Sequence, residues 1–137
     1  MKRRFSFALL VLILLTIGSN ILVLADDFSP YNNNTAGMSS AFAITETGEA
    51  IVAVNYEGYT NVATGATITI KIEKRTLLLF WSDVIDETIT VVGDNYFNEF
   101  HYQLEDKGTY RCTVDYCVSG TGGEDDLWTF QDTAKYE

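Results

Sequence analysis

The sequence has few of the side chains on which most catalytic and metal sites depend. It contains one histidine, His101, and two cysteines, Cys112 and Cys117, in 137 residues. Structural zinc sites take four nitrogen or sulfur ligands at characteristic spacings, and this set is too small. A serine triad would need the same histidine and a glycine-flanked serine elbow, which is absent. We therefore expect no catalytic residue, no metal site and no cofactor.

The two cysteines are too far apart along an extended chain to pair with each other. Five residues of strand span about 16 Å, whereas a disulfide needs Cα atoms within about 7 Å. Their odd separation also sends the side chains to opposite faces. We expect Cys112 to be a buried small side chain and Cys117 a free thiol. A Cys-His catalytic pair is disfavoured because only Arg111 is nearby in sequence to lower a thiol pKa.

Basic residues are scarce beyond the first few positions. Three of the nine lie at residues 2–4, which leaves six against 19 acidic residues in the rest of the chain. A nucleic-acid backbone would repel such a surface, so we expect no nucleic-acid partner. Lys71, Lys74 and Arg75 form the one basic cluster, with Glu73 inside it. We interpret that cluster as a solvated strand end.

Only one long apolar run is present, and it follows the basic residues directly. Residues 5–17 have the length of the hydrophobic region of a signal peptide, and Ala25 has a small side chain suited to cleavage before Asp26. We expect residues 1–25 to be a signal peptide and the chain to be secreted or displayed at the cell surface. The alternative is an uncleaved membrane anchor, since about 20 apolar residues span a bilayer. Membrane contact is expected only through residues 1–25, and only if they are retained.

Residues 26–37 are polar, contain the single proline, Pro30, and predict a flexible arm. From residue 38 to 137 apolar side chains recur with a period of two, which is typical of strands. Ile68, Ile70 and Ile72 share one face of the clearest of these, which we expect to be central. The pattern predicts an antiparallel β-sandwich of about seven or eight strands.

Two stretches of this region remain ambiguous. Residues 76–82, "TLLLFWS", are too apolar to alternate, and they fit either a strand covered on both faces or a partly exposed edge strand. The stretch "GTGGEDD" places Glu124, Asp125 and Asp126 in a glycine-rich turn. Oxygen clusters of this kind can hold calcium, but we favour a plain turn whose charges discourage edge aggregation.

The order D-x-G-x-Y-x-C at Asp106, Gly108, Tyr110 and Cys112 resembles the loop that enters strand F of immunoglobulin-type domains. In those domains the tyrosine bonds to upstream backbone and fixes a corner. The resemblance implies an immunoglobulin-like sandwich with a structural corner at these four residues. The usual inter-sheet disulfide is not expected, because residues 49–57 contain no second cysteine. The tryptophan expected on strand C is likewise missing, and an aliphatic strand takes its place.

Several stretches together carry a broader resemblance: "MKRR", "ATITIKIEKR", "DKGTYRCTV" and "GTGGEDD". The chain is similar to small secreted proteins of Gram-positive bacteria that combine a signal peptide with one immunoglobulin-like domain. This resemblance implies export and a fold but no activity. Our first hypothesis is a non-enzymatic binding or surface-interaction module with an unknown protein or glycan partner. The alternatives are a carbohydrate-binding module that uses exposed aromatics such as Trp81 and Trp128, and a hydrolase with unrecognised acids.

Overall fold

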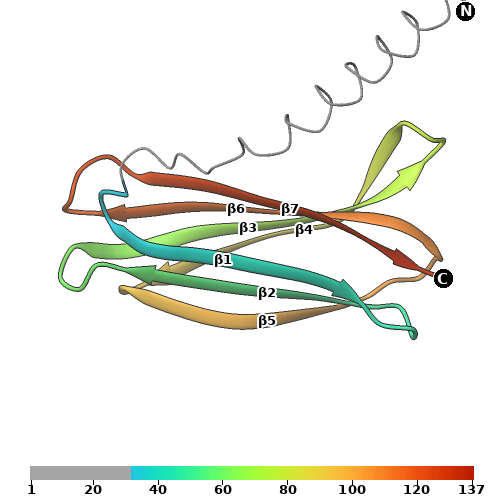
Figure 1. Ribbon diagram of the computed structural model, residues 1–137, viewed down its shortest axis with the longest axis horizontal. Helices are drawn as coiled ribbons and strands as arrows, with labels where there is room; N and C mark the ends of the chain where they lie inside the picture. Colours follow the sequence, from blue (N-terminus) through green and yellow to red (C-terminus); the bar gives the residue numbers. More distant parts are fainter. Residues whose placement is uncertain (1–31) are drawn as a thin grey trace, which may run out of the picture. The chain divides into compact units, whose positions relative to one another are not determined.

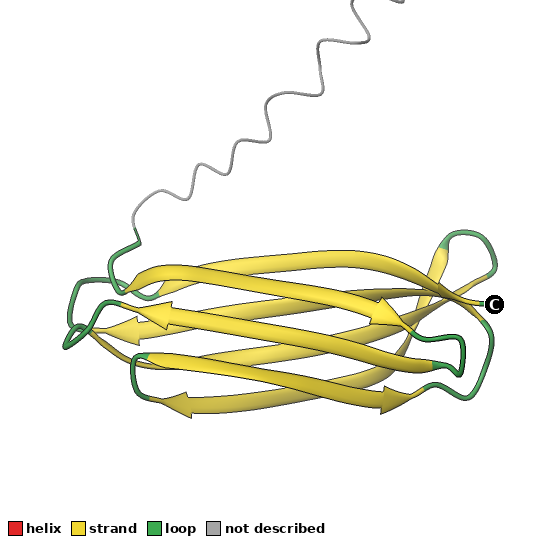
Figure 2. Ribbon diagram, turned by 60° about the horizontal axis from the view of Figure 1, so that its bottom comes forward, coloured by secondary structure: helices red, strands yellow, loops and turns green. Residues whose placement is uncertain are grey.

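Seven antiparallel strands make up residues 32–137, the part of the chain that the computed structural model describes (Figure 1). They are β1 (Thr35–Ile44), β2 (Glu49–Gly58), β3 (Ala63–Thr76), β4 (Phe80–Val92), β5 (Asn95–Gln103), β6 (Gly108–Gly120) and β7 (Asp126–Tyr136). One sheet has the order β1-β2-β5 and the other the order β4-β3-β6-β7. The two layers face each other, and the described residues include no helix (Figure 2). The predicted all-β sandwich is confirmed.

Strand β4 lies in the same sheet as β3, β6 and β7. Constant-type immunoglobulin domains place the fourth strand beside the fifth, whereas variable-type domains have additional strands in the sheet of strands C, F and G. In this protein β4 pairs with β3 along its length. The turn between β3 and β4 covers only residues 77–79, and so short a connection favours antiparallel neighbours. The chain then crosses to the other sheet at Gly93, whose φ of 114° suits glycine.

The core lies between the sheets and follows the predicted alternation. The central strand β3 contributes Ile68, Ile70 and Ile72, all fully buried. The inward side chains of β2 and β6 are buried as well: Ala50, Val52, Val54 and Tyr56 from β2, and Tyr110, Cys112, Val114, Tyr116 and Val118 from β6. These three strands thus place every second residue in the core, which is the usual arrangement in a two-layer sandwich.

The first strand begins earlier than the sequence suggested. We expected a flexible arm through residue 37, but β1 starts at Thr35. Residues 31–137 form one compact unit that contains the whole core. The signal peptide, its cleavage and the alternative membrane anchor concern residues 1–25, which lie outside the described residues. Within the described range, no helix has the length and apolar character needed to cross a membrane.

Tyr110 forms the corner at the start of β6. Its hydroxyl donates to the Asp106 carbonyl at 2.5 Å, and its ring is almost fully buried. Burial raises the pKa of the phenol, so the hydroxyl keeps its proton and acts as a donor. Gly108 has a φ of 151° between the two bonded residues, a value that L side chains rarely adopt. Cys112 follows two residues after Tyr110 on the same buried face.

Substituting Tyr110→Phe should lower the free energy of unfolding by about 1 kcal/mol, the net value of one such hydrogen bond. The ring would still fill its place, and the exposed Asp106 would leave its carbonyl accessible to water. Urea denaturation measures the change, with Tyr59→Phe as a control because Tyr59 is 45% exposed. Equal stability of the two variants would contradict a stabilising corner.

Candidate functional site

The turn between β3 and β4 places four consecutive apolar side chains in water. Leu77, Leu78, Leu79 and Phe80 are 86%, 81%, 82% and 65% exposed. Single exposed apolar side chains are common on protein surfaces, whereas adjacent ones form a patch of the kind that marks interaction sites. We call residues 77–80 the apolar tip. The sequence left residues 76–82 open between a strand covered on both faces and a partly exposed edge strand. The structure places a turn at residues 77–79, and residues 80–82 begin β4, which is an edge strand.

An irregularity in the β3–β4 pairing directs the apolar tip away from its sheet. Ile72 pairs with Ile85 and Glu73 pairs with Asp83, so Val84 is an extra residue on β4. A bulge of this kind bends a strand pair and increases its twist. In Figure 1 the end of the β3–β4 hairpin turns out of the plane of the sheet and projects from the body.

The backbone of the apolar tip is hydrogen-bonded within the hairpin. The Leu79 N–H donates to the Leu77 carbonyl at 2.5 Å. The Arg75 side chain donates from Nε to the Leu78 carbonyl at 2.7 Å, and its Nη2 donates to the same oxygen. The Thr76 hydroxyl donates to the Phe80 carbonyl at 3.5 Å. The tip therefore presents apolar side chains while several of its polar backbone groups have partners in the same hairpin.

Three side chains from three strands hold the base of the hairpin. Arg111 of β6 donates from Nε and Nη2 to Glu73 Oε2 of β3, at 2.8 and 2.6 Å. Its guanidinium carbon also lies 4.4 Å from the ring centroid of Trp81 on β4. Charge-assisted hydrogen bonds and cation–π contacts are strongest where water is partly excluded, and Glu73 is buried. The base is thus fixed to the sandwich.

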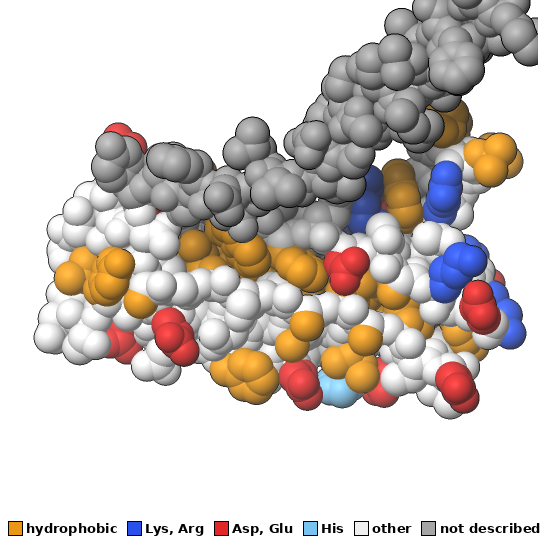
Figure 3. Space-filling model, viewed as in Figure 1, with side chains coloured by type: hydrophobic (Ala, Val, Ile, Leu, Met, Phe, Trp, Pro, Cys, Tyr) orange, Lys and Arg blue, Asp and Glu red, His pale blue; other side chains and the backbone are white. Residues whose placement is uncertain are grey.

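Basic side chains gather at the same end of the molecule as the projecting hairpin (Figure 3). Lys74 pairs with Asp106 at 3.1 Å, and Arg111 pairs with Glu73. No carboxylate partner for Arg75 is present among residues 32–137. The sequence interpreted Lys71, Lys74 and Arg75 as a solvated strand end. In the structure Lys71 pairs with Asp83 at 3.0 Å, and Lys74 and Arg75 form part of the base beneath the apolar tip.

The structure does not bring a histidine and a cysteine together. His101 faces outward from β5, with Nδ1 3.1 Å from Glu49 Oε1, while Cys112 is buried in the other sheet. Burial, and then the charge of Asp132, raises the pKa of Cys112 to about 12. Burial and a 3.6 Å contact with Asp125 also raise the pKa of Cys117. Both side chains are protonated at neutral pH and are poor nucleophiles.

We expect two free thiols per chain, as predicted from the sequence, because both cysteines are unpaired. A disulfide reagent at about pH 8 should modify Cys117 first and Cys112 about 100-fold more slowly, since thiolate fraction and access both fall with burial. Time-resolved thiol titration of the folded and denatured protein measures this, with Cys117→Ser to assign the phases. Absence of thiols after denaturation, or equal rates in the folded protein, would contradict it.

The aromatic side chains do not form one exposed platform in the part of the chain that is described. Trp128 packs against Tyr116 and Phe130, with ring centroids 5.5 and 6.4 Å away. Trp81 has Arg111 over its ring, and the exposed Phe97 lies in the other sheet. Carbohydrate modules stack sugars on open aromatic faces. The geometry thus favours the apolar tip over Trp81 and Trp128 as a contact surface.

The acidic turn before β7 holds the start of the described chain. Asp126 accepts the N–H of Asn33 at Oδ1 and the N–H of Asn34 at Oδ2, both at 2.8 Å. The Glu124 carbonyl accepts from the amide groups of the same two asparagines, at 3.2 and 3.0 Å. Across residues 32–137 no three His, Cys, Asp or Glu side chains are arranged to hold a metal ion. We call the four hydrogen bonds that Asp126 and the Glu124 carbonyl accept from Asn33 and Asn34 the Asp126 clasp.

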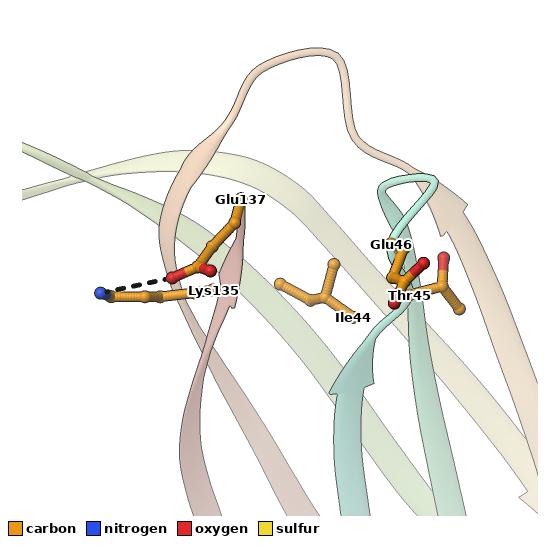
Figure 4. A pocket seen from close by; sticks show the side chains of 5 residues that line it. All are labelled: Ile44, Thr45, Glu46, Lys135 and Glu137. Atoms are coloured by element: carbon orange, nitrogen blue, oxygen red, sulfur yellow. Dashed lines mark ion pairs between the residues drawn. The ribbon is translucent and has the colours of Figure 1, made fainter.

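A shallow pocket of about 470 Å³ lies between the β1–β2 turn and the end of β7 (Figure 4). Ile44 lies in its middle, with Lys135 and Glu137 on one side and Thr45 and Glu46 on the other. Lys135 Nζ is 3.8 Å from Glu137 Oε1. The polar groups do not converge on one point, as they would in a catalytic or ligand site.

No protein-family model, curated protein or solved structure matches the chain. The resemblance to small secreted Gram-positive proteins therefore stays a prediction. The apolar tip is the site that the geometry singles out, and sequence reasoning missed it. The sequence contains a feature that could have indicated this site: residues 76–82 are apolar without alternation and directly follow Lys74 and Arg75.

Proposed function

We propose that the protein is an exported, non-enzymatic binding module whose contact surface is the apolar tip. One observation carries this proposal: Leu77, Leu78, Leu79 and Phe80 all lie in water on a projecting hairpin. Burying a side chain of this kind contributes roughly 1.5 to 3 kcal/mol to stability. The four side chains of the tip make no such contribution in the isolated fold. A partner that covers the tip would recover it.

Two further observations support a binding role without catalysis. Both thiols are held protonated by burial, and His101 pairs with Glu49 on an outer face. By contrast, the base of the hairpin is fixed by the Glu73–Arg111–Trp81 contacts. A rigid support lowers the entropy lost when a loop binds its partner. The export of the chain rests on residues 1–25 of the sequence.

Photo-crosslinking from the apolar tip tests this function for a partner of any chemical class. A benzophenone amino acid replaces Leu79 in the protein as its own cells produce it. A matched protein carries the same group in place of Leu127, which is 75% exposed on β7. We expect irradiation to attach a protein, glycan or lipid at position 79 and not at position 127. No adduct at position 79, or equal adducts at both positions, would refute the proposal.

A further inference from the structure

We propose that the apolar tip inserts into the surface of a lipid bilayer. This inference rests on the proposed function and names its partner as a membrane rather than a protein or a glycan. The tip is the end of a projecting hairpin and not a groove or a flat face (Figure 3). A convex tip needs a matching pocket to bind a protein, whereas a fluid bilayer adapts to its shape.

The area of the tip also fits a bilayer better than a protein partner. At about 150 Å² for a fully exposed side chain of this size, the exposed fractions of the four side chains, from 65% to 86%, add up to on the order of 500 Å². A stable protein–protein interface buries about 800 Å² on each partner. The tip falls short of that area, so a second copy of the chain would be held weakly by it. Membrane anchoring has no such threshold, because each inserted side chain adds to the affinity separately.

The hydrogen bonds within the hairpin suit an apolar environment. In the hydrocarbon region an unpaired backbone group costs several kcal/mol, so inserted segments satisfy their polar groups internally. The Leu77 carbonyl accepts from the Leu79 N–H, and the Leu78 carbonyl accepts from Arg75. The Phe80 carbonyl accepts from the Thr76 hydroxyl. These bonds can persist at the membrane interface, where the charged Arg75 side chain stays at headgroup level while the apolar side chains insert.

The groups just beneath the tip match the headgroup layer. Tryptophan and arginine or lysine side chains are typical of the membrane interface, where an apolar part meets a polar one. Trp81 lies against Arg111 at this level, and Lys74 and Arg75 flank the turn. Lys74 and Arg111 pair with Asp106 and Glu73, and Lys71 of the same strand pairs with Asp83. Arg75 has no carboxylate partner among the described residues, so it is the cation at this level that is free to meet anionic lipid.

The acidic remainder of the molecule favours one orientation at such a surface. Charges farther than about 8 Å from the headgroups are screened at physiological salt, so the base of the hairpin determines the local attraction. Asn33 and Asn34 are bonded to the turn before β7, at the end of the sandwich opposite the hairpin (Figure 1). With the tip inserted, the opposite end of the sandwich would make no contact with the membrane. The sequence predicted membrane contact only through residues 1–25, and this inference adds a second contact.

Vesicle flotation tests the inference on the predicted exported form, residues 26–137, which contains the whole compact unit 31–137. The vesicles are phosphatidylcholine, with or without phosphatidylglycerol. We expect the protein to float with both and several-fold better with the anionic lipid. The triple variant Leu77→Asn/Leu78→Gly/Leu79→Ser should lose about tenfold or more in partitioning. The variant Leu127→Ser is the control, because it removes a leucine of comparable exposure, 75%, on another strand.

The outcomes separate this inference from the proposed function. The membrane inference is supported if the parent protein and the Leu127→Ser control float with the vesicles and the triple variant does not. No flotation of the parent protein, or equal flotation of the triple variant, overturns it. If position 79 then crosslinks to a protein or a glycan, the binding module stands and only the membrane is refuted. If position 79 crosslinks to nothing, both fail. A dimer that the triple variant abolishes, without vesicle binding, also overturns the membrane inference.

Discussion

The substitution Asp126→Ala should lower the free energy of unfolding by about 3 to 5 kcal/mol. Asp126 is only 5% exposed, and its two oxygens each accept one backbone N–H, from Asn33 and Asn34. Hydrogen bonds to a charged acceptor contribute about 1.5 to 3 kcal/mol each, and the donors left behind would lack a partner. The total free energy of unfolding of a small domain is roughly 5 to 15 kcal/mol, so this loss is a large fraction of it.

Chemical denaturation with urea measures this loss, and the neighbouring Asp125→Ala provides the control. Asp125 is exposed, and its contact with the Cys117 thiol is long, at 3.6 Å. We expect that control to change stability by less than about 0.5 kcal/mol, as is usual for surface positions. An equal loss of stability in both variants would show that the hydrogen bonds of the Asp126 clasp do not specifically stabilise the turn before β7.

The clasp also accounts for the glycines of the turn before β7. A Cβ at Gly120, the last residue of β6, would collide with Asn34 Oδ1 and with the Val62 carbonyl oxygen, and one at Gly122 would collide with the Asn33 carbonyl oxygen. No side chain fits at either place, so the backbones approach closely only because these positions are glycine. The sequence showed a glycine-rich acidic turn but not its partner, because the bonded residues are more than 90 positions apart.

The strands could be predicted because their signal is local. Where one face of a strand is buried, every second side chain must be apolar, and a shift by one residue would expose the whole set. The alternation at Ile68, Ile70 and Ile72 therefore identified a central strand. The tyrosine corner is similarly local, because Tyr110 bonds to Asp106 four residues earlier. Both features are visible within a short window of sequence.

The sheet to which a strand belongs is not a local property. Strand β4 lies beside β3 and not beside β5, the strand that follows it in the chain. The three-residue turn at residues 77–79 decides this pairing. That turn could not be predicted from propensity, because leucine rarely adopts a positive φ. Leu77 and Leu78 have φ values of 46° and 55°, so the turn runs against the preferences of its own residues.

The substitution Leu77→Asn/Leu78→Gly should therefore raise the free energy of unfolding by about 2 kcal/mol. A left-handed backbone costs roughly 1 to 2 kcal/mol for an ordinary L residue, and both leucines adopt it. Asparagine and glycine are the residues that hairpin turns with positive φ prefer. No core contact would be lost, because both side chains lie in water. The midpoint of thermal unfolding should rise by roughly 10 °C.

Thermal and urea unfolding of the double variant measure this gain, with Leu79→Ser as its control. Leu79 is as exposed as its neighbours but is not among the residues with positive φ. The control should leave stability within about 0.5 kcal/mol of the parent protein, which separates backbone strain from the exposure of apolar surface. A double variant that is no more stable than the control would contradict the strained turn. A double variant that is more stable but no longer floats with vesicles would show that the leucines serve contact at the expense of the fold, as expected where binding opposes stability.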